Sequence, residues 1–178
     1  MKIDNLICKS MKKCFYYLCV VLVGVVCLNS CDDDDDNIRL ANVPEKVLVT
    51  MEEMYPNVTI VEWEKYREYY VAEFWYQGVE RHVWFSGDGT WRMTKTDMGH
   101  SLEGLPEIVR NAFLGTQYAT WEVDDVAMFE RPDFTFYLVE VEANGQRDRD
   151  LFFATDGTLL KNEVDNYDRE VTPDTELH

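Results

Sequence analysis

The chain has 178 residues, and 34 acidic side chains against 17 basic ones give it a formal charge of −17. Such a surface repels nucleic acid and anionic headgroups, which excludes nucleic-acid binding; the charge either serves solubility or attracts a cationic partner. All five cysteines lie within the first 31 residues, so the remaining chain has no disulfide and depends on its hydrophobic core.

The N-terminus has the pattern of a lipoprotein signal peptide. Residues 1–13 carry four lysines, and residues 15–28 form an apolar run too short for a comfortable membrane span. The run ends in Leu28-Asn29-Ser30-Cys31, which resembles the lipobox of bacterial lipoproteins. We therefore expect a signal peptide over 1–30 and a lipidated Cys31, anchored in the bacterial outer membrane and periplasmic or surface-exposed. The alternatives are an ordinary signal peptide with a chance cysteine, or an N-terminal anchor.

Five adjacent aspartates follow the predicted lipidation site, within an expected tether over residues 31–42. They cannot pack side by side, so the run should be extended and solvated. It could be a spacer or a weak Ca²⁺ chelator, although it has no turn that would wrap an ion. It also resembles the surface-export signal of Bacteroidota-type lipoproteins, formed here by Asp32, Asp33, Asp34, Asp35 and Asp36.

The first structural unit is predicted over residues 43–96. Val43-Pro44-Glu45 is typical of a helix start, because proline there loses no hydrogen bond and glutamate complements the helix dipole. Val47 and Met51 fall on one apolar stripe, and Tyr55-Pro56 should end the helix. Four strand-like runs follow, at residues 58–64, 69–76, 81–85 and 90–94.

The same order returns after an expected linker over residues 97–104. Leu105-Pro106-Glu107 should begin a second helix, with Gly115 just past its end. The second unit then occupies residues 105–164, and residues 165–178 form a polar tail that we expect to be frayed. Its strand-like runs lie at residues 120–129, 134–142, 149–153 and 158–161.

Each unit ends in a hairpin signal, Asp88-Gly89 or Asp156-Gly157, because both residue types tolerate positive φ. Counting alternate positions back from the turns places matching residues of both units on one sheet face. The sequence thus predicts an α+β fold, a tandem duplication of a helix plus a four-stranded antiparallel sheet, with the helices on one face. That face carries Tyr70, Ala72, Phe74, Val83 and Phe85, then Tyr137, Val139, Val141, Leu151 and Phe153.

The Pro-Glu helix start, the Tyr-x-Val-x-Val strand with its Asn/Gln-Gly turn and the Phe-x-x-Asp-Gly hairpin resemble the PepSY-like (beta-lactamase-inhibitor-protein-like, or BLIP-like) family. The resemblance covers residues 43–161 in two copies. Ala72, where a larger residue is usual, and the Arg131-Pro132-Asp133 turn depart from the pattern. The resemblance implies a secreted or periplasmic binding module; some distant relatives inhibit enzymes by docking on the sheet face. It offers no catalytic residues to carry over.

The opposite sheet face carries an unusual amount of aromatic and acidic surface, which should not stay bare. We interpret it as a platform for an unidentified protein or peptide partner, because tryptophan and tyrosine are favoured interface anchors. Alternatively, strand twist, the linker or the other unit covers these residues. The platform comprises Val71, Glu73, Trp75, His82, Trp84, Phe136, Leu138, Glu140 and Phe152, with Glu142 and Asp150 nearby.

No pattern in the chain indicates catalysis. His82, His100 and His178 lie far apart without ligand spacing, and hairpin turns explain Asp88 and Asp156. No nucleophile elbow or phosphate-binding loop is present. We therefore expect a binding protein, inhibitor-like, that is no enzyme and needs neither cofactor nor metal. The alternative is a glycan-binding accessory lipoprotein in which Trp75 and Trp84 stack on sugar rings.

Overall fold

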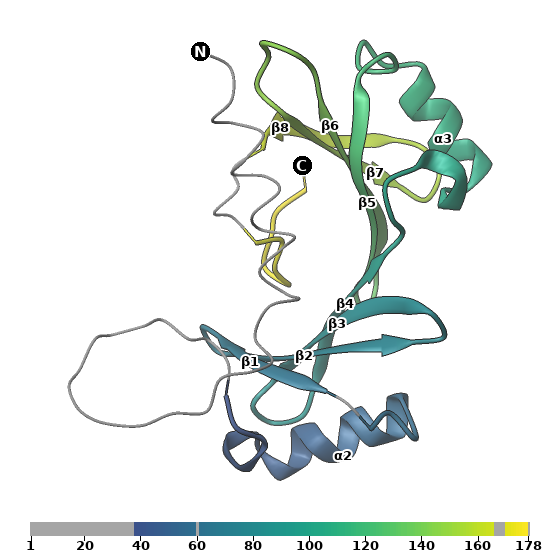
Figure 1. The fold of residues 1–178 in the computed structure, drawn as a ribbon. Coiled ribbons are helices and arrows are strands. Elements are labelled where there is room, and N and C mark those ends of the chain that lie inside the picture. Colours follow the sequence, from purple (N-terminus) through teal and green to yellow (C-terminus); the bar gives the residue numbers. More distant parts are fainter. Residues whose placement is uncertain (1–37, 60, 166–169, 178) are drawn as a thin grey trace, which may run out of the picture. The chain divides into compact units, whose positions relative to one another are not determined.

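The computed structural model describes residues 38–59, 61–165 and 170–177, all within one compact unit, Asp35–His178 (Figure 1). Eight strands form a single antiparallel sheet in which each strand pairs with the next along the chain. The α+β class is thereby confirmed. The strands are β1 (Glu62–Tyr66), β2 (Tyr69–Tyr76), β3 (Val79–Ser86), β4 (Trp91–Asp97), β5 (Glu122–Glu130), β6 (Thr135–Glu142), β7 (Arg149–Ala154) and β8 (Leu159–Val164).

Helix α2 (Glu45–Met54) packs on the first four strands and begins where the sequence predicts, directly after Pro44. Its buried residues are Val47 and Met51, one turn apart, so a single stripe faces the sheet. A short 3-10 helix, η2 (Leu40–Asn42), precedes it. The core between α2 and the sheet includes Trp63, Ala72, Phe74, Val83 and Phe85.

Helix α3 (Glu107–Leu114) packs in the same way on strands β5, β6 and β7, through Val109 and Phe113. The 3-10 helix η3 (Leu102–Gly104) leads into it. Gly115 follows the helix as predicted, but its φ of −81° is ordinary, so no left-handed residue ends this helix. The core between α3 and the sheet includes Val126, Tyr137, Val139, Val141, Leu151 and Phe153.

The two halves are joined through backbone pairing, because β4 pairs antiparallel with β5. Asp97, expected to open a linker, is the last residue of β4 and lies opposite Ala127.

The first strand also differs from expectation. Asn57 adopts a positive φ of 69° just after the helix, and β1 begins only at Glu62.

The two Asp-Gly turns form by a mechanism that differs from the expected one. Only the glycines have positive φ, +88° at Gly89 and +85° at Gly157. The aspartates instead accept hydrogen bonds from the backbone two residues on, Asp88 from Thr90 at 3.0 Å and Asp156 from Thr158 at 2.9 Å. Each turn is therefore held by its aspartate side chain and bent by its glycine.

Candidate functional site

The predicted binding platform lies on the sheet face opposite the helices, which we call the tail face. Apart from Trp75, its apolar members are buried, and none of these exceeds 3% exposure. They share one hydrophobic core with Met93 and Phe129. The expectation of an open aromatic face is therefore wrong for Val71, Trp84, Phe136, Leu138 and Phe152.

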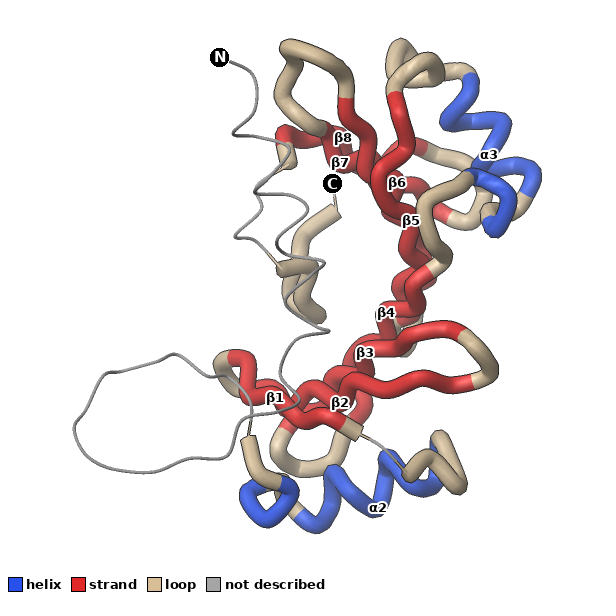
Figure 2. The backbone as a smooth tube through the Cα atoms, in the orientation of Figure 1, coloured by secondary structure: helices blue, strands red, loops and turns tan. Residues whose placement is uncertain are grey.

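The C-terminal residues 171–177 help to close this core. Leu177 is 8% exposed and belongs to the cluster, and Val171 packs against it. Figures 1 and 2 show the segment beside the sheet on the side away from α3. The expectation of a frayed tail is therefore wrong for these residues, because Val171 and Leu177 pack on the tail-face core.

Hydrogen bonds hold the same segment. The Arg131 guanidinium donates to the backbone oxygens of Thr172 at 2.8 Å and of Thr175 at 3.1 Å. The Tyr69 hydroxyl donates to the Asp174 carboxylate at 2.8 Å. Arg131 belongs to the turn that departs from the family pattern, so this departure provides the clamp for the tail.

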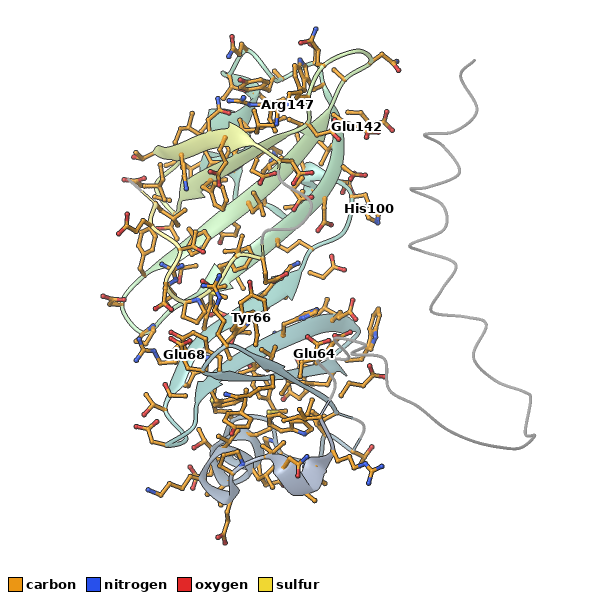
Figure 3. The ribbon with its side chains drawn as sticks, turned by 90° about the vertical axis from the view of Figure 1, so that its left-hand side faces the viewer. Glu64, Tyr66, Glu68, His100, Glu142 and Arg147 are labelled. Carbon is orange, nitrogen blue, oxygen red and sulfur yellow. The ribbon has the colours of Figure 1, made fainter. Side chains whose placement is uncertain are left out.

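A row of carboxylates crosses the remaining part of the tail face. Strand pairing sets Glu62 opposite Glu73, and Glu140 opposite Asp150. Figure 3 looks onto this side and labels two neighbours of the row, Glu64 on β1 and Glu142 on β6. We call the set the acidic row; its members are Glu62, Glu73, Glu80, Asp97, Asp125, Glu140, Asp150 and Glu163.

Three carboxyl groups of the row have raised pKa values. Burial, with the charges of Asp150 and Asp125, raises the pKa of Glu140 to about 7. Burial, followed by a hydrogen bond with Glu80, raises the pKa of Glu73 to about 7. The pKa of Asp125 is raised as well, chiefly by burial. A positive charge placed on the row would relieve this cost.

Trp75 stands at one end of the acidic row, directly opposite Glu80 in the β2–β3 pairing. It is 68% exposed and is the most exposed of the large apolar side chains in the described part of the chain. Of the platform's apolar residues, it is the one that remains accessible. The open part of the tail face is thus acidic, with the exposed Trp75 ring beside it.

His82 faces Glu73 across the β2–β3 ladder and is brought together with two glutamates. Its Nδ1 lies 3.9 Å from a carboxylate oxygen of Glu73. One potential ligand atom from each of Glu73, Glu80 and His82 lies within 4.8 Å of the others. The pKa of His82 is lowered to about 4, chiefly by burial and then by Lys95, so its ring is neutral.

The spacing of residues along the chain does not reveal this cluster, because its members come from two paired strands. The signal was the Gln77-Gly78 turn, since a two-residue hairpin turn fixes the register of both strands. It sets Glu73 opposite His82, and Glu80 lies two positions before His82 on the same face. The other two histidines are not part of it: His100 lies near Asp125 at 3.8 Å, and His178 is outside the described residues.

The predicted lipidation site Cys31 and the export signal at Asp32, Asp33, Asp34, Asp35 and Asp36 also lie outside the described residues. In the part that the structure describes, neither α-helix combines the length and the apolar character needed to cross a membrane.

One family of known sequences and several solved structures match this chain. The family described as "Putative beta-lactamase-inhibitor-like, PepSY-like" matches residues 68–161. A DUF2874 family protein of Bacteroides ovatus is 37% identical, with a TM-score of 0.67 over 70% of this chain and 91% of its own. A BLIP-like protein of Bacteroides fragilis is 34% identical, with a TM-score of 0.65 over 72% and 92%.

A third solved structure bears on the cellular compartment. It is a Bacteroides eggerthii protein described as "putative periplasmic", 28% identical, with a TM-score of 0.65 over 68% of this chain and 88% of its own. No curated protein matches the chain.

Proposed function

Because the chain belongs to the PepSY-like, beta-lactamase-inhibitor-like family, we propose that it is a non-catalytic envelope protein that binds another protein or peptide. The binding surface is the open part of the tail face, and the partner presents a basic segment to it. Inhibition of an enzyme would be one form of such binding, and the BLIP-like neighbour makes it a reasonable first assay.

The observation that carries this proposal is the acidic row with Trp75 beside it. Two carboxyl groups of the row, on Glu73 and Glu140, have pKa values raised to about 7. A lysine or arginine of the partner would stabilise their ionised forms. Trp75, at 68% exposure, offers a rigid aromatic anchor. Charge would then guide the encounter and the tryptophan would slow dissociation.

The glycan alternative has less support. It relies on Trp75 and Trp84 as a pair of stacking rings, but Trp84 is 2% exposed inside the tail-face core. One exposed ring could still stack on a sugar. However, a row of carboxylates beside it favours a cationic ligand over a neutral one.

We also propose that the protein is a lipoprotein anchored through Cys31, with the aspartates after it acting as a surface-export signal. The support is the sequence pattern together with a relative described as "putative periplasmic".

The matching order of helix and four strands in each half supports an origin by tandem duplication. So does the placement of Gly89 and Gly157 against the helix of their own half.

Photo-crosslinking in the native cell tests the binding proposal. A benzophenone amino acid at Trp75 should capture a defined partner. The same amino acid at Ile108, which is 53% exposed on the surface of α3, should capture none. Binding of the captured protein to the purified full-length chain should weaken about 10-fold or more with Trp75→Ala and weaken further with added salt. Equal crosslinking at both positions would contradict the proposal.

A further inference from the structure

We propose that Glu73, Glu80 and His82 form a binding site for a divalent transition-metal ion of the Zn²⁺ type. The three residues lie on the hairpin of β2 and β3, and their potential ligand atoms lie within 4.8 Å of one another. The site does not depend on the proposed partner, because every ligand comes from this chain.

The hairpin fixes the geometry of the site. Glu73 and His82 face each other across the β2–β3 ladder, and Glu80 lies two residues before His82 and on the same face. Directly opposite residues such as Glu73 and His82 have Cβ atoms about 4.5–5.5 Å apart. The backbone is therefore in place before an ion arrives, and only rotamers have to adjust.

The folded chain already holds two of the ligands close together. The Nδ1 of His82 lies 3.9 Å from a carboxylate oxygen of Glu73. The side chains of Glu73 and His82 are 12% and 25% exposed, so water screens them only in part. An ion could therefore enter from solvent yet be held in a partly dry site.

The donor set indicates the class of ion. One imidazole and two carboxylates suit Zn²⁺ and its first-row neighbours, which accept nitrogen and oxygen ligands in sets of three or four. Ca²⁺ requires six to eight oxygen ligands, which three side chains including an imidazole do not supply. Three protein ligands also leave at least one position for water.

The charges around the site favour a cation on balance. From β1, Glu62 lies opposite Glu73, and Glu64 also acts on the Glu73 carboxyl. From β4, Asp97 and Lys95 act on His82 with opposite signs, and Lys95 lies directly opposite it. Glu62, Glu64 and Asp97 thus add three negative charges around the ligands, and Lys95 adds one positive charge.

Calorimetric titration of the full-length chain in detergent micelles with Zn²⁺ tests the site. The five cysteines are alkylated first, so that thiolates cannot bind the ion. We expect one ion per chain, with Ca²⁺ failing to compete. Loss of an outer-shell partner alone costs about 10–100-fold in metal affinity, so Glu80→Gln and His82→Gln should each weaken binding at least 10-fold.

Glu62→Gln is the matched control, because it removes a nearby charge from the row without removing a proposed ligand. It should weaken binding by less than about threefold, and urea unfolding of each variant checks that the fold is kept. A second readout is the nuclear magnetic resonance of the His82 ring, whose signals should broaden selectively with Mn²⁺. Absence of binding, unchanged affinity in Glu80→Gln, or equal losses in Glu62→Gln and Glu80→Gln would overturn the proposal.

Discussion

Trp84 and Trp75 project from the same face of the sheet but lie in opposite surroundings. The Trp84 ring makes edge contacts with the rings of Tyr66 and Tyr69, at centroid distances of 5.4 and 5.8 Å. It is 2% exposed, whereas Trp75 is 68% exposed. The first is a core residue, and the second is available to a partner.

This contrast gives a stability prediction. Trp84→Ala should lower the free energy of unfolding by about 3–5 kcal/mol, because it empties a closed core. Trp75→Ala should lower it by less than about 0.5 kcal/mol. Urea denaturation of the two variants measures both values. A small loss in Trp84→Ala would mean that the tail face is open in solution.

Glu140 gives a pH prediction. Its pKa is about 7 in the folded protein, above the 4.5 that is ordinary for a glutamate, so the folded state binds the proton more tightly than the unfolded state. Its destabilising effect is therefore absent below about pH 4.5, grows between 4.5 and 7, and is complete above 7. Glu140→Gln should gain about 1–2 kcal/mol over the wild type across that window, after discounting for partial solvation.

Urea titrations at pH 4.5 and pH 7.5 measure this change. The difference between wild type and Glu140→Gln is the quantity of interest, since other carboxylates also titrate in this range. A difference that stays constant with pH would show that Glu140 ionises freely.

At the level of elements, the Asp-Gly turns do more than reverse the chain. A Cβ added at Gly89 would lie 2.7 Å from the backbone oxygen of Lys46 on α2. One added at Gly157 would lie 3.0 Å from the backbone oxygen of Ile108 on α3. Each glycine lets the hairpin press against the helix of its own half.

Gly145 provides a control for this role, because its φ is +76° but nothing lies within 4 Å of an added Cβ. Gly145→Ala should cost only the left-handed backbone strain, about 1–2 kcal/mol. Gly89→Ala should cost a further 1–3 kcal/mol or so, because backbone atoms must also move apart. Thermal and urea unfolding compare the two variants, and equal losses would contradict the close contact.

Residue patterns predicted the elements well where local rules decide the outcome. Alternation assigned Phe85 and Phe153 to the helix side, where both are fully buried. The docked tail could not be foreseen, because only Leu177 and Val171 mark it and their partners lie far away in the chain. The cluster of Glu73 and His82 could have been foreseen, since it follows from the register of one short turn.

For the whole molecule, the proposed anchor makes a prediction about location. Cys31→Ala should abolish labelling with palmitate and move the protein from the membrane fraction to the soluble one, because each buried acyl CH₂ contributes about 0.8 kcal/mol to anchoring. Cys27→Ala, four positions earlier in the apolar run, should keep the label. Labelling that persists in Cys31→Ala would refute the lipoprotein assignment.

The docked tail also has a consequence for the order of folding. Each strand pairs with its sequence neighbours, so hairpins can form one after another as the chain emerges. The bond from Tyr69 to Asp174 instead spans 105 residues and can form only once the last residues are available. We therefore expect the tail-face core to close last. A chain clipped after residue 170 would lose Val171 and Leu177 from this core, and we expect proteases to cut it more readily than the intact chain.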